Sequence, residues 1–166
     1  MSARPARPPA TPLGLTPAQV RIVQKVAEGK STAAIASDLT ITTGTINVQI
    51  QHCGQKLGVR GRAAIVHACY VTKQLERPRK VTFPGTLSDA EIETWQMIAI
   101  GATPQEYGDR ARISRDTAVQ RTRDLRKRVD AGNDPHLVSL GWTYGVLDES
   151  LVEMASGTIL RAQAPV

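Results

Sequence analysis

The stretch that decides the fold is LTPAQVRIVQKVAEGKSTAAIASDLTITTGTINVQIQHCGQKLGVRGRAAIV, residues 15–66. Its apolar side chains recur every three or four residues, which is the period of amphipathic helices. Ser or Thr precedes three of these runs and glycine follows two, as helix caps do: Thr16, Ser31 and Thr42 at the starts, Gly29 and Gly58 at the ends. The pattern predicts short helices packed on one another.

Four helices are expected in this part of the chain. The first runs from Pro17 to Gly29, and a short second helix follows the cap at Ser31. A tight turn then leads to a third helix, whose inner face carries apolar residues at spacings of four, three and four: Ile46, Ile50, Cys53 and Leu57. A fourth helix is expected from about Arg62 to Leu75.

A shift of 72 residues lays the chain on itself without a gap. Identical residues then coincide at apolar and at punctuating positions, among them Leu15 with Leu87, Ala18 with Ala90, Gly29 with Gly101, Ile41 with Ile113, Thr45 with Thr117 and Leu75 with Leu147. Chance would not preserve both kinds of position together, so we interpret the chain as two homologous four-helix modules. Module one is residues 15–75 and module two is residues 87–147.

Three segments lie outside the modules. Residues 1–14 are predicted to form a disordered basic arm with Arg4 and Arg7, where contact with a DNA backbone is open. The linker, residues 76–86, is rich in proline and basic residues and is expected to be extended, with a reach of about 35 Å. The C-terminal tail, residues 148–166, has a weak apolar pattern that predicts at most a short helix: Leu151, Val152 and Met154.

Composition narrows the function classes. The net charge is +6 and the pI about 9.7, which favours a polyanionic partner. No apolar run approaches the roughly 20 residues of a membrane helix, and residues 1–14 lack the apolar core of a secretory signal. We therefore expect no membrane partner and a cytoplasmic, nucleoid-associated protein.

The sequence carries no sign of catalysis. It shows no nucleophile–base pair, glycine-rich phosphate loop or paired carboxylates, and its three histidines are scattered. Cys53 and Cys69 sit at apolar helix positions and match no zinc or redox spacing. We expect that the protein is not an enzyme and that it has no cofactor, no catalytic residues and no metal site.

The second and third helices of each module have the ingredients of a helix-turn-helix, in which a capped second helix presents polar residues outward to the major groove. The predicted fold class is thus all-α, with two tandem four-helix helix-turn-helix modules. Module one resembles the LuxR-type (GerE-like) DNA-binding domain through a set of short motifs: Leu15-Thr16-Pro17, Ala27-Glu28-Gly29-Lys30-Ser31, Ile35-Ala36, Leu39-Thr40-Ile41, Thr45-Ile46 and Lys56-Leu57-Gly58-Val59 with Arg62. Module two resembles it in outline, as a divergent copy, at Leu87-Ser88, Ala99-Ile100-Gly101, Ile113-Ser114 and Thr117.

Module one departs from the family at several charged positions. The usual acidic residues of the first and second helices are Gln19 and Ala34 here, although module two keeps Glu91 and Glu106. The recognition helix of the family often carries Lys where this chain has Asn47 and Gln51. Amides have replaced charge on this helix.

The resemblance implies that the third helix of each module contacts DNA. In module one the candidates are Thr42, Thr43, Thr45, Asn47, Val48, Gln51 and Gln55. Asn and Gln can bond adenine with two hydrogen bonds, and a Val methyl can touch that of thymine. The alternative for this face is a solvated surface rich in amides.

The third helix of module two is densely basic. Its candidates are Ser114, Arg115, Thr117, Gln120, Arg121, Arg123 and Lys127. Arg123 stands where module one has Gln51 and suits guanine, whereas Arg115, Arg121 and Lys127 suit phosphates. The alternative is a charged solvent face supported by pairing with Asp116 and Asp124.

These observations predict a sequence-specific protein for double-stranded DNA, a transcriptional regulator that uses two recognition helices from one chain. Because those helices differ, the two half-sites are expected to differ. The fourth helices could pair within the chain as a pseudo-dimer or between chains as a homodimer. Two other functions stay open: an accessory protein of a plasmid, phage or conjugative element in replication, partition or transfer, and an adaptor whose module two docks RNA polymerase or another protein.

Overall fold

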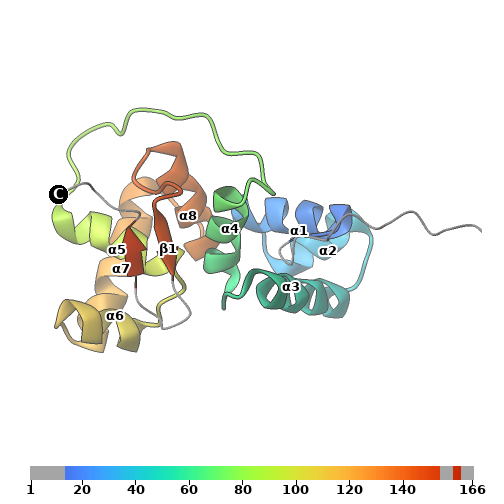
Figure 1. Cartoon of the computed structure of the whole chain (residues 1–166), viewed down its shortest axis with the longest axis horizontal. Coiled ribbons are helices and arrows are strands. Elements are labelled where there is room, and N and C mark those ends of the chain that lie inside the picture. The colour runs from blue at the N-terminus through green and yellow to red at the C-terminus, as the bar shows by residue number, and fades with distance from the viewer. Residues whose placement is uncertain (1–13, 154–158, 162–166) are drawn as a thin grey trace, which may run out of the picture.

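The computed structural model describes residues 14–153 and 159–161, and side chains up to Leu151. The described residues form eight helices, which confirms the predicted all-α fold class (Figure 1). In chain order they are α1 (Pro17–Ala27), α2 (Thr32–Leu39), α3 (Thr43–Leu57), α4 (Arg62–Val71), α5 (Asp89–Ala99), α6 (Pro104–Ala111), α7 (Arg115–Val129) and α8 (Asp134–Thr143). None of these helices is long and apolar enough to cross a membrane.

The tail differs from the sequence-based expectation. Residues 151–153 and 159–161 form two short antiparallel strands, β1 (Leu151–Glu153) and β2 (Ile159–Arg161), not a helix. Leu151 is buried, and its carbonyl lies 2.7 Å from His67 Nε2, so β1 starts from a fixed point on the helical body. The predicted arm with Arg4 and Arg7, and Met154 in the tail, fall outside the described residues.

Hydroxyl side chains begin the helices as their sequence positions predict. Thr16, Ser31, Thr42, Ser88, Thr103 and Ser114 each accept a hydrogen bond from the backbone N–H three residues on. At α1, Gln19 also accepts from the Thr16 N–H, which completes a capping box. These caps satisfy amide groups that the first turn leaves without a helical partner.

The fourth helices are shorter than expected. Helix α4 ends at Val71, and Lys73 adopts a left-handed conformation at φ 62°. The Gln74 N–H then bonds the Cys69 carbonyl at 2.8 Å, and the Lys73 N–H bonds that of Tyr70 at 3.2 Å. This pair of bonds is a Schellman motif, which closes the helix before Leu75.

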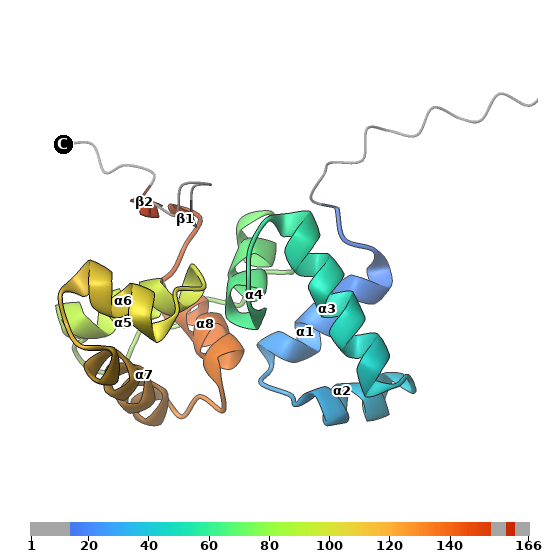
Figure 2. The same cartoon turned by 90° about the horizontal axis from the view of Figure 1, so that it is seen from below.

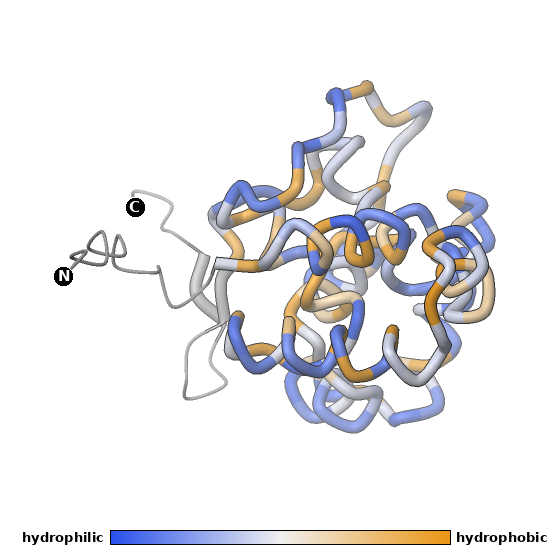
Figure 3. Tube along the Cα trace, turned by 90° about the vertical axis from the view of Figure 1, so that its right-hand side faces the viewer, coloured by the Kyte–Doolittle hydropathy of each residue, from blue (hydrophilic) through white to orange (hydrophobic). Residues whose placement is uncertain are grey.

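Every helix of the second half begins and ends 72 residues after its counterpart in the first half. The left-handed residues that end α2 and α3, Thr40 and Gly58, likewise recur as Arg112 and Asp130 at the ends of α6 and α7. Figure 3 shows hydrophobic and hydrophilic positions alternating along these helices. The two halves therefore have the same backbone plan, although their side chains differ.

The linker lies along the helical body rather than standing free. Residues 76–86 contain no helix or strand and cross the upper side of the molecule in Figure 1. The Val81 N–H bonds the Thr143 carbonyl at 2.8 Å, and the Phe83 ring meets that of Tyr144 edge-on at 5.1 Å. The two fourth helices of the modules, α4 and α8, pack against each other.

Candidate nucleic-acid interface

Helix α3 is held by its inner face and its first turn. Ile46, Ile50 and Cys53 are buried against α1, α2 and α4. The Thr42 hydroxyl accepts from the Thr45 N–H at 3.1 Å and lies 3.0 Å from the Thr45 hydroxyl. Because the inner face is packed and the start is capped, the outer face has a fixed direction.

The candidates of module one all lie on that outer face. Thr42, Thr43, Thr45, Asn47, Val48, Gln51 and Gln55 are exposed. Val48 is 48% exposed, which is unusual for a large apolar side chain in the described part of this chain. An apolar side chain presented between amides suits contact with a base edge better than contact with water.

The structure adds a residue that the sequence-based candidates lacked. Arg62, the first residue of α4, donates from Nη2 to Asn47 Oδ1 at 3.0 Å. An amide oxygen has two acceptor sites, so one site and the amino group of Asn47 remain for a base. Arg62 was part of the motif that signalled the family, but the 15-residue separation hid its contact with the recognition helix.

A polar network ties α3 to α1. Gln19 is only 3% exposed; its Nε2 donates to Gln49 Oε1 at 3.0 Å, and its Oε1 accepts from Lys56 Nζ at 2.8 Å. The same two positions carry Glu91 and Arg128 in module two, with Arg128 Nη1 2.6 Å from Glu91 Oε2. The hydrogen bond from Arg128 lowers the pKa of Glu91 below its ordinary value, as does the cap at Ser88. Helices α3 and α7 are thus anchored at equivalent points.

Helix α7 repeats the arrangement of α3. Ser114 accepts from the Thr117 N–H at 3.0 Å, and its hydroxyl donates to that of Thr117 at 2.8 Å. Ala118 and Leu125 are buried on the inner face. The outer candidates Ser114, Arg115, Thr117, Gln120, Arg123 and Lys127 are exposed, whereas Arg121 is half-buried.

The basic residues of α7 divide into two groups. Four are engaged within the chain: Arg115 with Asp116 at 3.8 Å, Arg121 with Glu93 at 3.6 Å, Arg126 with Asp134 at 3.1 Å and Arg128 with Glu91. Arg123 and Lys127 form no ion pair with any residue that the structure describes, and both are exposed. Gln120 Nε2 donates to Asp124 Oδ1 at 2.7 Å. The groups most available to a ligand are therefore Arg123 and Lys127.

Helices α3 and α7 can both be seen from one side of the molecule. In Figure 1, α3 and α6 lie along the lower side and the linker crosses the upper side. Figure 2, seen from below, shows α3 and α7 with no other helix in front of them. One chain therefore presents two capped helices on a shared face.

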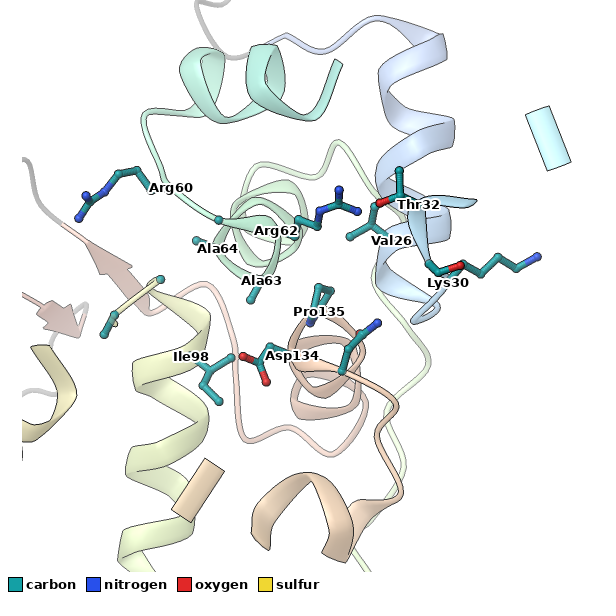
Figure 4. A pocket seen from close by; sticks show the side chains of 15 residues that line it. Val26, Lys30, Thr32, Arg60, Arg62, Ala63, Ala64, Ile98, Asp134 and Pro135 are labelled. Atoms are coloured by element: carbon teal, nitrogen blue, oxygen red, sulfur yellow. The ribbon is translucent and has the colours of Figure 1, made fainter. Parts of the chain in front are cut away.

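A cleft of about 600 Å³ separates the modules, with walls from the α1–α2 turn and the starts of α4 and α8 (Figure 4). Lys30, Arg60 and Arg62 line it, and the side chains of Arg60 and Lys30 extend away from its centre. The Arg60 side chain is 85% exposed, and its nearest carboxylate among the described residues is Glu106 at 3.9 Å. Asp38 raises the pKa of Lys30, so that side chain stays charged. The cleft thus carries basic side chains outside the sequence-based candidates; Lys30 is paired with Asp38 at 2.6 Å, and the acidic Asp134 also lines the cleft.

Comparison with known proteins bears on the first half. No curated protein and no solved structure matches the chain. Residues 13–69 match the model of the GerE family, described as bacterial regulatory proteins of the luxR family. The match covers about a third of the chain and includes α1, α2, α3 and most of α4. Residues 13–69 are therefore a LuxR-type helix-turn-helix domain, the DNA-binding domain of a family of bacterial regulatory proteins.

Proposed function

We propose that the chain is a transcriptional regulator that binds a specific double-stranded DNA site through α3 and α7 together. The observation that carries this proposal is that α7 repeats α3 in bounds, cap and outward exposure, on the same side of the molecule. On this view module two is a divergent copy of the LuxR-type domain in module one, and it has kept the recognition geometry while changing its chemistry.

Helix α3 supplies amide and apolar contacts. Asn47 and Gln51 are one helical turn apart on the exposed face, which suits bonds to successive adenines, and Val48 beside them suits a thymine methyl. Thr42, Thr43 and Thr45 at the start of the helix offer hydroxyls to a phosphate. Module one is therefore expected to prefer a site rich in A·T pairs.

Helix α7 supplies guanidinium contacts. Arg123 is free to bond the O6 and N7 of guanine, while Arg115 and Lys127 lie on the same helix for phosphates. Gln120, Ser114 and Thr117 complete the exposed face. Arg121 reaches a phosphate only if it leaves Glu93 and the Tyr107 hydroxyl, so its contribution is expected to be smaller than that of Arg123.

The test is selection from a random DNA pool followed by binding measurements at several salt concentrations. Affinity should fall steeply with salt, by a slope of about −0.9 for each phosphate contacted. Arg123→Ala should relax the preferred sequence at the module two half-site. Arg79→Ala is the matched control, because Arg79 is an exposed arginine of the linker on the side away from α3. If duplex binding is absent or independent of salt, the proposal is wrong.

One observation favours a second candidate function, an adaptor in which module two docks RNA polymerase or another protein. Three arginines of α7 are already paired with carboxylates of α5 and α8. The same selection from a random DNA pool distinguishes the adaptor from the regulator that binds DNA through both helices. An adaptor would give one half-site only, and Arg123→Ala would leave DNA affinity unchanged.

A further inference from the structure

The contact between the two modules has an internal symmetry. Tyr70 of α4 and Trp142 of α8 occupy equivalent positions, 72 residues apart, and their ring centroids lie 5.3 Å from each other. Both side chains are buried, at 5% and 3% exposed. Contact between a position and its own counterpart is expected only where a two-fold axis passes between them.

The neighbouring contacts come in exchanged pairs. The Trp142 Nε1–H donates to His67 Nδ1 at 3.0 Å, and the Tyr70 hydroxyl lies 3.1 Å from that of Ser139. Position 67 is equivalent to 139 and position 70 to 142, so the second contact is the first with the modules exchanged. The chemistry differs at each site, but the geometry repeats.

A second exchanged pair lies at the glycines that follow α1 and α5. A Cβ added at Gly29 would come within 3.1 Å of His136 Cβ, and one added at Gly101 within 3.0 Å of Ala64 Cβ. Gly29 is equivalent to Gly101 and Ala64 to His136. At the level of helices, α1 contacts α8 just as α5 contacts α4.

Such reciprocity defines an isologous interface, in which one patch meets the same patch on its partner. If the two modules were related by a translation in space, a surface of one module would instead contact a different surface of the other. The arrangement is also well fixed. Arg77 of the linker stacks over Trp142 at 5.1 Å and donates to the Tyr70 carbonyl at 2.9 Å. The linker thus reinforces the pairing rather than separating the modules.

We propose that the DNA site of this chain consists of two unlike half-sites in inverted orientation, and that a single chain occupies both. The inference rests on the proposed function and adds the polarity and stoichiometry of the site. A two-fold relation between the modules makes α3 and α7 approach the duplex in opposite directions. The two strands of DNA are themselves related by two-fold axes, so opposed helices read opposite strands.

The halves are unlike because the equivalent residues of the two helices differ at four positions: Asn47 and Val119, Val48 and Gln120, Gln51 and Arg123, Gln55 and Lys127. One half is chemically suited to A·T pairs and the other to G·C pairs. The surface of α4 that could pair with a second chain is covered by α8 within the same chain. Binding therefore needs no second copy.

The first experiment uses the unaltered protein. The best site from random selection is rebuilt with the module two half-site reversed in place, at the same centre-to-centre distance of about one helical turn. Reversal should lower affinity by about 100-fold, because the second module then contributes no effective concentration. Equal affinity for the two arrangements would overturn a fixed relative orientation of the modules. A single half-site would instead overturn the proposed function.

The second experiment makes the two faces alike. The variant Val119→Asn, Gln120→Val, Arg123→Gln and Lys127→Gln gives α7 the residues of α3 at these four positions. Its selected site should become a palindrome built from two copies of the module one half-site, and a direct repeat of that half-site would overturn the inverted orientation. Circular dichroism checks that the variant is folded. Mass measurement of the complex should give one chain per duplex for both proteins, and two chains would overturn the single-chain stoichiometry.

Discussion

The two modules have equivalent helix bounds but fill their cores with different side chains. Module one has an aliphatic core, with Val23 and Ile35 where module two has Trp95 and Tyr107. The third helices differ in the opposite direction: module one has Ile46 and Ile50 where module two has the smaller Ala118 and Thr122. The polar atoms of the large rings are satisfied, since Trp95 Nε1 donates to the Leu137 carbonyl at 2.7 Å and the Tyr107 hydroxyl lies 2.7 Å from that of Thr94.

The caps and turns therefore keep the same helix arrangement in both modules, although the large core side chains lie on different helices. A core tolerates such exchange when the total volume is kept. The outward faces have no such constraint. They carry amides in α3 and guanidinium groups in α7, although the two helices have equivalent bounds.

The largest effect is expected when the core of one module is given a single residue of the other. Trp95→Val leaves a cavity, because Ala118 and Thr122 remain small, and should cost about 2–4 kcal/mol of unfolding free energy. Adding Ala118→Ile should recover part of that loss. Urea denaturation of the single and double variants measures both. An equal loss in the two variants would show that volume does not compensate between these helices.

A smaller effect is expected on DNA binding from the outward faces. Asn47→Ala and Gln51→Ala should each cost roughly 1–3 kcal/mol on the preferred site and relax the sequence of one half-site only. Arg121→Ala should instead weaken binding to all sequences, to the extent that Arg121 leaves Glu93 for a phosphate. Selection from a random pool distinguishes the two outcomes. An unchanged motif for Asn47→Ala would remove that residue from base recognition.

The interface provides a pH test that compares equivalent positions 67 and 139. Trp142 can only donate, so His67 accepts at Nδ1 and donates from Nε2 to the Leu151 carbonyl, which requires a neutral ring. Burial lowers the pKa of His67 below its ordinary value, against smaller opposing contributions from the Leu151 carbonyl and Asp148. As pH falls below 6.5, the unfolded chain therefore takes up the proton first and stability decreases.

Thermal unfolding between pH 7.5 and 5.5 measures this dependence. His67→Gln keeps a donor and an acceptor but does not titrate, so its Tm should fall less over the same range. Ser139 at the equivalent position has no such group, and Ser139→Ala should leave the slope as in the unaltered protein. Parallel slopes for all three proteins would show that His67 does not couple the interface to pH.

The smallest effect is expected at the anchor of α7. Glu91→Gln removes the ion pair with Arg128, which is partly exposed, and should cost about 0.5–1 kcal/mol at neutral pH. The pKa of Glu91 is lowered in the folded chain, so its contribution is present above 4.5 and is lost as pH falls through the folded value. The difference in Tm between Glu91→Gln and the unaltered protein should vanish in acid. A constant difference would assign the loss to the capping box at Ser88.

The sequence was sufficient for the helices because their starts carry local signals. Thr16, Ser31 and Thr42 and their counterparts mark each cap without reference to tertiary structure. The ends of α4 and α8 were misplaced because Leu75 and Leu147, which are buried beyond the left-handed turns at Lys73 and Gly145, continue the apolar pattern of the helices.

Ion pairs between residues far apart in the chain could not be predicted from the sequence. The partners of Arg121 and Arg128 lie 28 and 37 positions away on α5, so periodicity along α7 could not separate engaged arginines from available ones. The candidate residues on α3 and α7 remain predictions, and the exposure of all but Arg121 is compatible with them. The sequence left open whether the fourth helices pair within one chain or between two chains. Contacts within the chain, such as that of Tyr70 with Trp142, favour the first alternative.

The α4–α8 contact also determines how binding should respond to the amount of protein. When a regulator must first dimerise, the occupancy of its DNA site rises with the square of the protein concentration at low concentrations. Here the pairing step is completed when the chain folds, and the two halves remain linked at an effective concentration in the millimolar range. Occupancy should then rise hyperbolically, so that a modest pool of protein gives a graded output instead of a threshold. Under the proposed function, a substitution in α3 or α7 alters one half of the site, whereas in a homodimer it would alter both.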